Sequence, residues 1–229
     1  MISMINALAK GTNFLFGRIL KRRKIFIGHS LVYLYRERHI DRNYFDYIRL
    51  ATLELVSYEI NKKKLEGNVA ELGVYRGKFA RYLNQYFPDR TLYLLDTFEG
   101  FDKRDIISET NNDFSAGTQD FSDTSIESVL KLMPYPQKCI PVKGFFPESA
   151  VNINDQFVLV SLDADLFEPI YNGLQFFYSK LVTGGYIFIH DFNNDSYKGA
   201  RQAVEKFCAE QKINFLPVPD LGGSAIIIK

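Results

Sequence analysis

The sequence lacks several features that define common classes of protein. Its 229 residues include only two cysteines, Cys139 and Cys208, which do not have the spacing of metal ligands. We interpret them as small buried thiols in a reducing compartment. The formal net charge is only +1, which argues against bulk electrostatic binding of nucleic acid. No apolar run reaches the roughly 18–20 residues that a membrane-spanning helix needs.

The N-terminus also lacks the order of a secretory signal. Its basic cluster, "KRRK" at 21–24, follows the apolar stretch "FLFGRIL" instead of preceding it, so we expect a cytoplasmic protein. Residues 10–49 mix Lys and Arg with Phe, Leu, Ile and Tyr. We predict that residues 1–43 are a basic amphipathic helical extension that packs on its own domain or on a dimer mate, and we expect a homo-oligomer. A flap near the substrate and docking of residues 10–40 on anionic lipid are the alternatives.

Strand and helix patterns alternate over residues 44–229, where a hydrophobic content of 46% can supply a core. Apolar spacing of three and four predicts a helix over 44–64. Strands are expected within 69–72, 90–98, 138–149, 156–165 and 184–192, and helices from 78, over 125–133, over 166–181 and over 197–211. The polar stretch after Phe98 is about 25 residues long, and a loop of that length in a compact domain is usually functional or partly disordered.

Near-continuous apolar strands joined by helices indicate a parallel sheet covered on both faces. Residues 213–229 resemble two strands joined by a Gly-Gly turn with no helix between them, so one of the two is expected to run antiparallel. The predicted fold is α/β, a doubly wound and mostly parallel sheet with an antiparallel C-terminal hairpin. Ligands bind beyond the carboxyl ends of the strands in such sheets. The polar residues expected there are Glu71, Asp96, Asp163, Asp165, His190 and Asp191.

The stretch "AELGVYRG" places Glu71, Gly73 and Gly77 at the first strand-to-helix turn. A glycine turn lets a ligand approach the backbone and the helix N-terminus, although a tight turn alone would also need glycine. The pyrophosphate fingerprint G-x-G-x-x-G is absent, which disfavours a dinucleotide enzyme. An acid at this strand end suits a ligand with a cationic part, such as an amino group.

The second strand ends at Asp96, 23 residues after Gly73, which fits one βαβ unit. A carboxylate there can accept hydrogen bonds from the two hydroxyls of a ribose, or it can simply be solvated. Together with Glu71, it points to a nucleoside that carries a cationic amino-acid tail and no phosphate. S-adenosylmethionine meets that description.

The stretch "LDADLFEP" places Asp163 and Asp165 on one side of the chain if strand geometry persists, and Asp191 ends the neighbouring strand. Carboxylates that converge from adjacent strand ends repel one another unless some take up protons. A hard divalent cation relieves that repulsion and can hold a substrate hydroxyl. Separate solvated acids are the other reading.

Six segments in this order resemble the macrocin O-methyltransferase family: "VAELGVYRG", "LLDTFEGF", "VKGFFPES", "SLDADLFEP", "GGYIFIHDF" and "GARQAVEKF". The family's enzymes are metal-dependent and methylate sugar hydroxyls of macrolide and aminocoumarin antibiotics. The resemblance covers about residues 44–229. It implies the fold of class I (Rossmann-like) methyltransferases, with seven strands, as in catechol O-methyltransferase. It also implies S-adenosylmethionine as methyl donor and usually Mg²⁺.

The resemblance assigns roles by position. Asp163 is the first metal ligand, and Asp165 is the general base for the acceptor hydroxyl. Asp96 holds the ribose, and the pair His190-Asp191 falls where the family usually has Asp-Asp at the metal. The remaining residues expected to contact the cofactor are Glu71, Gly73, Tyr75, Gly77, Thr97, Phe98 and, beside the metal, Asp163.

His190 departs from the family pattern, because imidazole replaces a carboxylate and removes a negative charge. Mg²⁺ prefers oxygen ligands, whereas Mn²⁺, Fe²⁺ or Zn²⁺ accept imidazole more readily. Three readings stay open. His190 ligates a softer metal, or it turns aside and leaves Mg²⁺ on Asp163, Asp191 and waters, or the site holds no metal and His190 acts as a base or hydrogen-bond donor.

The leading hypothesis is a metal-assisted, S-adenosylmethionine-dependent O-methyltransferase that acts on a sugar hydroxyl, free, nucleotide-linked, or in a glycan or glycosylated natural product. The alternatives are a metal-independent small-molecule methyltransferase, a nicotinamide oxidoreductase, and a catalytically silent nucleoside-binding or scaffold protein. Four aromatic residues of the 98–121 stretch either cover the sugar ring or anchor the loop in the core: Phe98, Phe101, Phe114 and Phe121.

Overall fold

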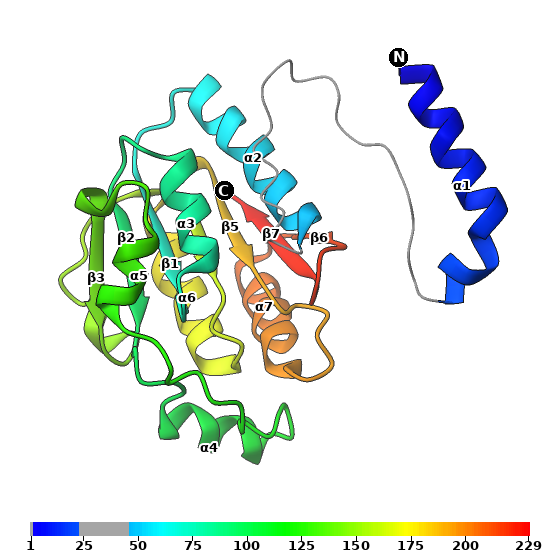
Figure 1. Ribbon diagram of the computed structural model, residues 1–229. Helices are drawn as coiled ribbons and strands as arrows, with labels where there is room; N and C mark the ends of the chain where they lie inside the picture. The colour runs from blue at the N-terminus through cyan, green and yellow to red at the C-terminus, as the bar shows by residue number, and fades with distance from the viewer. Residues whose placement is uncertain (1, 23–45) are drawn as a thin grey trace. The chain divides into compact units, whose positions relative to one another are not determined.

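The computed structural model describes residues 2–22 and 46–229, and the chain divides into two units, residues 1–43 and 44–229. The described part of the first unit is helix α1 (Ile2–Arg22), so the predictions made for residues 23–43 lie outside the described residues. Among the described helices, none is long and apolar enough to cross a membrane. The second unit holds the sheet and the remaining helices (Figure 1).

The second unit is built on one seven-stranded sheet in the order β3-β2-β1-β4-β5-β7-β6 (Figure 1). The strands are β1 (Asn68–Leu72), β2 (Leu92–Asp96), β3 (Cys139–Lys143), β4 (Phe157–Leu162), β5 (Leu181–Ile189), β6 (Leu216–Val218) and β7 (Ser224–Ile228). The first five run parallel. β7 lies antiparallel to both β5 and β6, which confirms the predicted antiparallel hairpin.

Helices cover both faces of this sheet and form two hydrophobic cores. They are α2 (Tyr47–Lys62), α3 (Lys78–Tyr86), α5 (Ile126–Leu132), α6 (Phe167–Lys180) and α7 (Lys198–Gln211). Helix α4 (Lys103–Asn111) lies beyond the sheet and contacts α6 (Figure 1). Short 3-10 turns occur at Pro136–Lys138 and Glu148–Ala150. α6 and α7 pack on one face through side chains such as Phe177 and Phe207. α2, α3 and α5 pack on the other through Leu53, Leu83 and Val129. Each such side chain contributes about 1.5–3 kcal/mol when fully buried.

β4 shows why its sequence is apolar at every position. Its six residues are all buried, with Val160 and Leu162 facing the α6–α7 core and Val158 facing the other. A strand covered on both faces has no solvent side on which polar residues could alternate. The polar residues therefore begin only where the strand ends, at Asp163.

Chain order reverses between β1 and β4, which makes the carboxyl ends of these two strands the switch point of the sheet. Gly73 brings the two ends together. A Cβ atom at this position would lie 2.2 Å from the carbonyl oxygen of Asp163, and its φ of +85° is unfavourable for other residues. Asp163 in turn donates its N–H to the carbonyl of Leu72 at 2.8 Å. Gly73 thus has a steric role, because it lets the ends of β1 and β4 meet. From the sequence, ligand approach or a tight turn was expected to be the reason for this glycine.

Most predicted elements are present, and the differences are local. The long polar stretch contains helix α4, capped by Asp102, which the sequence reading missed. β5 begins at Leu181, three residues before the expected glycine. α5 begins with a Ser125–Ser128 capping box. Of the two free cysteines, Cys208 is buried and Cys139 is half-buried, so the predicted burial is confirmed for Cys208.

Candidate functional site

A cavity of about 340 Å³ lies at the carboxyl ends of β1, β2, β4 and β5. Its lining includes most of the residues predicted from strand ends: Glu71, Gly73, Tyr75, Asp96, Thr97, Asp163, Asp165, His190 and Asp191. Two predicted cofactor residues lie outside the lining. Gly77 packs against Val129 of α5, and Phe98 is buried in the core with α2 and α3.

Asp96 fixes the first glycine turn from the end of β2. Its Oδ2 accepts the N–H groups of Val74 and Tyr75 at 2.7 and 2.9 Å, and its Oδ1 accepts that of Phe98 at 2.7 Å. The hydroxyl of Thr97 donates to the carbonyl of Gly100 at 2.6 Å. Thr97 Oγ1 also lies 3.4 Å from Asp96 Oδ1. Since its one proton goes to the closer carbonyl of Gly100, about one of the four acceptor positions of the carboxylate is left for a ligand.

Glu71 is a buried acid with an unsatisfied oxygen. Its side chain lines the cavity with an exposed fraction of 1% for the residue, and its Oε2 has no hydrogen-bond partner in the described part of the chain. Burial, followed by the charge of Asp163, raises the pKa of Glu71 well above its ordinary value. A buried acceptor without a partner is costly, so the site favours a ligand that brings a cationic donor.

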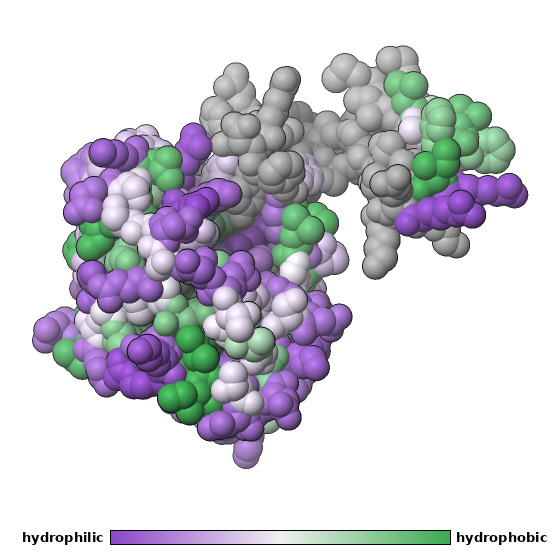
Figure 2. All heavy atoms as spheres, turned by 60° about the horizontal axis from the view of Figure 1, so that its bottom comes forward, coloured by the Kyte–Doolittle hydropathy of each residue, from purple (hydrophilic) through white to green (hydrophobic). Residues whose placement is uncertain are grey.

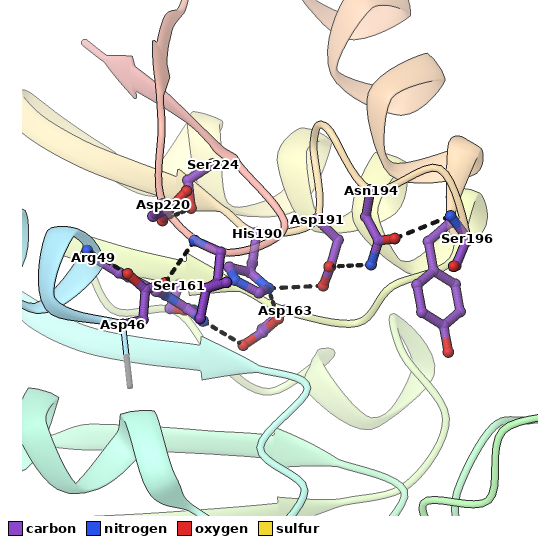
Figure 3. Close-up of polar contacts among 12 residues, drawn as sticks. Asp46, Arg49, Ser161, Asp163, His190, Asp191, Asn194, Ser196, Asp220 and Ser224 are labelled. Atoms are coloured by element: carbon purple, nitrogen blue, oxygen red, sulfur yellow. Dashed lines mark hydrogen bonds and ion pairs between the residues drawn. The ribbon is translucent and has the colours of Figure 1, made fainter. Parts of the chain in front are cut away.

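Asp163 is held between two cationic groups at the end of β4 (Figure 3). Nη1 of Arg49, from α2, lies 3.0 Å from Asp163 Oδ2. Nδ1 of His190 lies 3.0 Å from Asp163 Oδ1 and 2.7 Å from Oδ2 of Asp191. The Arg49 guanidinium also stacks over the ring of Phe79 at 3.8 Å, which fixes its position.

The contacts in this cluster shift the pKa values of its members in opposite directions. Burial alone would raise the pKa of Asp163, but the charges of Arg49 and His190 hold it below the ordinary aspartate range. Burial alone would lower the pKa of His190, but the charge of Asp163 and hydrogen bonds to Asp163 and Asp191 raise it to about 10. The positive charges of Arg49 and His190 therefore balance the negative charges of Asp163 and Asp191.

His190 also faces a second acidic pair. Asp46, His190 and Asp220 form a group whose potential ligand atoms lie within 4.8 Å of one another. Asp46 caps α2 by accepting the N–H of Arg49, and it accepts the N–H of Leu221 at 3.2 Å. Asp220 accepts the hydroxyl of Ser224 at 2.6 Å. The imidazole thus lies among acids contributed by α2, β4, β5 and the β6–β7 turn (Figure 3).

Asp165 lies in the turn after β4 and not in an extension of the strand. Its φ is +60°, so the alternation of strand side chains that the sequence reading assumed ends at Asp163. It nevertheless joins the cluster through Asp191. Burial, then the charges of Asp191 and Asp163 and a hydrogen bond with Asp191, raise the pKa of Asp165 well above its ordinary value. Asp165 therefore keeps its proton to a higher pH than an exposed aspartate.

Asp191 also has a left-handed backbone, with a φ of +58°. Asn194 holds it by donating from Nδ2 to Asp191 Oδ1 at 2.7 Å. The β6–β7 turn supports the same segment, because a Cβ at Gly222 would lie 2.7 Å from Asp191 Oδ1. Non-glycine residues in this backbone region cluster at functional sites.

Two of the four aromatic residues predicted to cover a sugar ring line the cavity, namely Phe101 and Phe121. Their rings pack edge to face at 5.0 Å between centroids, and Phe121 packs against Tyr75 at 4.9 Å. Phe98 is a core residue, and Phe114 packs against Phe167. For these two residues the loop-anchoring interpretation is the one the contacts support.

Arg49 and Asp105 are two of the charged cavity residues that were not predicted from the sequence. Arg49 is buried on the same helical stripe as Leu53 and Ser57, and a cation on a buried stripe signals a carboxylate partner. Asp105 of α4 lines the cavity, where burial, then the charge of Asp102, raises its pKa to about 7. Its helix itself was not predicted, so no signal placed Asp105 at the site.

Comparisons with known proteins give one family and several similar structures. The family model described as macrocin-O-methyltransferase (TylF) matches residues 45–226. The structure of the O-methyltransferase NovP is 18% identical, covers 79% of each chain and has a TM-score of 0.62. Calicheamicin methyltransferase CalS11 is 18% identical, covers 79% of this chain and 78% of its own, and has a TM-score of 0.60. Another structure of it is described as TDP-rhamnose 3'-O-methyltransferase.

A putative caffeoyl-CoA O-methyltransferase from Staphylococcus aureus is 13% identical, with 97% of this chain and 96% of that chain covered and a TM-score of 0.54. At these identities the structural likenesses establish the fold. No curated protein sequence matches the chain significantly.

Replacing Arg49 by Met tests the charge balance of the cluster. We expect the free energy of unfolding in urea to fall by about 3 kcal/mol or more at neutral pH, because the change leaves Asp163 buried without one of its cations. Since the folded-state pKa of Asp163 is depressed, the contribution of the pair is present above the unfolded pKa and disappears as acid protonates the carboxylate.

The matched control is Lys143→Met, which removes the cation of an exposed pair with Glu99 at 2.7 Å. We expect little change, within about 0.5 kcal/mol. Equal losses of stability in the two variants would contradict a special role for the buried pair.

Proposed function

This chain belongs to the macrocin O-methyltransferase family, and we propose that it transfers the methyl group of S-adenosylmethionine to a hydroxyl of a sugar-containing acceptor. Its sheet is the class I methyltransferase fold predicted from the sequence. The sugar acceptor is supported by NovP and by CalS11, which is described as a TDP-rhamnose 3'-O-methyltransferase. Membership in this family does not support the nicotinamide alternative.

The observation that carries the proposal is the unsatisfied oxygen of Glu71 beside the first glycine turn. The ammonium group of the methionine part of S-adenosylmethionine would supply both the missing donor and a compensating positive charge. Asp96 would accept one ribose hydroxyl with its remaining lone pair, where the sequence reading expected two. Gly73, Tyr75 and Thr97 would line the cofactor, whereas Gly77 and Phe98 would shape its turn from behind.

Asp165 would act as the general base on the acceptor side. The acceptor oxygen attacks the sulfonium methyl carbon in line with the breaking C–S bond, and its proton passes to the Asp165 carboxylate. The products are the methyl ether and S-adenosylhomocysteine. The protein supplies orientation and close contact for this transfer, and a positioned base typically contributes about 10²–10⁴-fold to the rate.

A divalent metal fits the residues present. His190, Asp163 and Asp191 each offer one ligand atom, and these atoms lie within 4.8 Å of one another. Arg49 contacts Oδ2 of Asp163, which leaves the other oxygen facing His190. One imidazole nitrogen with carboxylate oxygens suits Mn²⁺, Fe²⁺ or Zn²⁺ better than Mg²⁺. When bound, such an ion would polarise the acceptor hydroxyl.

The contacts bear on the readings of His190. Its Nδ1 points into the Asp163–Asp191 pair, which supports the two readings in which His190 takes part in the site; Mg²⁺ on Asp163, Asp191 and waters stays the third prediction. A softer metal on His190 and a metal-free site with a cationic His190 both fit the geometry. A methyltransferase that needs no metal therefore stays the alternative. A catalytically silent protein would bind the cofactor through Glu71 and Asp96 but would not methylate an acceptor.

Phe101 and Phe121 would contact the sugar ring, because both line the cavity and their rings pack against each other. We also propose an extension at 1–43 and a catalytic domain at 44–229, which the division into two units supports. A cytoplasmic location rests on the order of the N-terminal sequence. A homo-oligomer rests on the amphipathic character of residues 10–60.

The cofactor proposal is tested by isothermal titration with S-adenosylmethionine and S-adenosylhomocysteine. We expect the protein to bind both, and Glu71→Gln to weaken binding at least tenfold, since hydrogen bonds to charged groups contribute about 1.5–3 kcal/mol. The pKa of Glu71 is raised in the free protein, so binding of a cationic ligand should release a proton from Glu71. This release would make the measured binding enthalpy depend on the ionisation enthalpy of the buffer.

Glu99→Gln is the matched control, since this exposed residue pairs with Lys143, and it should bind like the unmodified protein. Absence of binding to both ligands would overturn the function. Unchanged affinity in Glu71→Gln would remove only the role of Glu71.

Replacing Asp165 by Asn should lower turnover by at least about 10²-fold while leaving cofactor affinity intact, because only proton transfer is lost. In the unmodified protein the raised pKa of Asp165 means that the rate should rise with pH as this carboxyl loses its proton. The assay is transfer of labelled methyl from S-adenosylmethionine to a panel of nucleotide sugars. Exposed Asp195, changed to Asn, is the control. An unchanged rate in Asp165→Asn would assign the base elsewhere.

Replacing His190 by Asp should shift the metal preference toward Mg²⁺, because it restores an all-oxygen ligand set. Direct titration with Mn²⁺ and Mg²⁺ measures the change, and activity after treatment with EDTA accompanies it. We expect the unmodified protein to bind Mn²⁺ more tightly than Mg²⁺ and the variant to reverse or narrow that order. Full activity and no metal binding in the EDTA-treated unmodified protein would instead establish the metal-independent alternative.

A further inference from the structure

Helix α1 (Ile2–Arg22) lies outside the part of the chain that the family model matches, which begins at residue 45. It also belongs to a different unit from the sheet. The proposed methyl transfer uses none of its residues. We propose that α1 binds the surface of an anionic lipid bilayer and lies in the plane of the interface, a property that goes beyond the proposed function.

The first support is an exposed apolar stripe along the helix. Leu8, Leu15 and Ile19 fall within about 40° of one another at 100° per residue, and 63%, 74% and 64% of their surfaces are exposed. Phe16 extends the stripe and is 53% exposed. Figure 2 shows green, hydrophobic side chains beside purple, hydrophilic ones among the described residues of this helix. An apolar stripe of this kind must be covered by another apolar surface or by lipid.

The second support is the sign of the charge around the stripe. Lys10, Arg18 and Arg22 are exposed on the same helix. The first 36 residues of the sequence carry seven Lys and Arg and no Asp or Glu, whereas the remaining residues carry 21 Lys and Arg and all 27 Asp and Glu. A cationic polar face beside a stripe of Leu, Ile and Phe is the pattern of helices that lie on anionic membranes. Each such cation adds about fivefold to affinity for an anionic surface.

A lipid surface fits this helix better than a groove of a second copy. Gly11 and Gly17 lie within the continuous helix, and a Cβ at either position would meet nothing within 4 Å in the described residues. Glycine weakens an isolated helix in water, so α1 gains order from any surface that holds its stripe. A bilayer needs only the stripe and the cations, whereas a protein groove needs shape complementarity as well.

The test is sedimentation of the full chain with vesicles. Vesicles of phosphatidylcholine mixed with phosphatidylserine should bind the protein, vesicles of phosphatidylcholine alone should bind it at least tenfold more weakly, and added salt should release it. Leu15→Glu should reduce binding at least tenfold, because it places a charge in the stripe.

Phe14→Glu is the matched control. This residue is 87% exposed and lies about 120° around the helix from Leu8, so the variant adds the same charge outside the stripe and should lose clearly less affinity. Equal losses in the two variants would overturn the proposed orientation. Absence of binding to both kinds of vesicle would overturn the proposal itself.

Sedimentation velocity measures the oligomeric state of the unmodified protein and of Leu15→Glu. If Leu15→Glu dissociates an oligomer and the unmodified protein binds no vesicles, the stripe covers a second copy and the proposal is wrong. Titration with S-adenosylhomocysteine runs in parallel, because unchanged cofactor binding in the α1 variants separates failure of this inference from failure of the proposed enzyme activity.

Discussion

The buried ion pair between Arg49 and Asp163 is the interaction on which the site depends. It joins α2 to the end of β4 and leaves one carboxylate oxygen for His190. Without the charges of Arg49 and His190, the buried carboxylates of Asp163 and Asp191 would repel each other. The pair therefore keeps Asp163 charged in the cavity. Its cation, Arg49, comes from α2, which precedes the sheet in the sequence.

The charge balance divides the cleft into two chemically different halves. At the end of β1, one carboxyl oxygen of Glu71 has no hydrogen-bond partner in the described part of the chain and favours a positive ligand. At the ends of β4 and β5, the acids are paired, and Asp165 is pushed toward its protonated form. Two aspartates, Asp165 and Asp191, have left-handed backbone conformations, which are energetically unfavourable. Asn194 and the turn at Gly222 pack against Asp191 and help to hold it there.

The sequence predicted those parts of the site that follow from local pattern. The ends of the apolar runs show where the strands end. The sequence therefore predicts that one edge of the sheet holds Glu71, Asp96, Asp163 and His190. Arg49 could not be paired in that way, because it meets Asp163 across 114 residues. Asp96 was expected to face a ligand, but three backbone amides use most of its acceptor capacity.

The β6–β7 turn has a consequence for the order in which the molecule becomes competent during synthesis. Phe192 and Asn193 donate their N–H groups to the carbonyls of Gly223 and Gly222, and β7 must insert between β5 and β6 before this contact exists. A nascent chain that has emerged as far as Asp191, just after β5, already contains every acid proposed for the reaction. It lacks the turn that supports Asp191, so the cofactor half can form before the half that accepts the substrate.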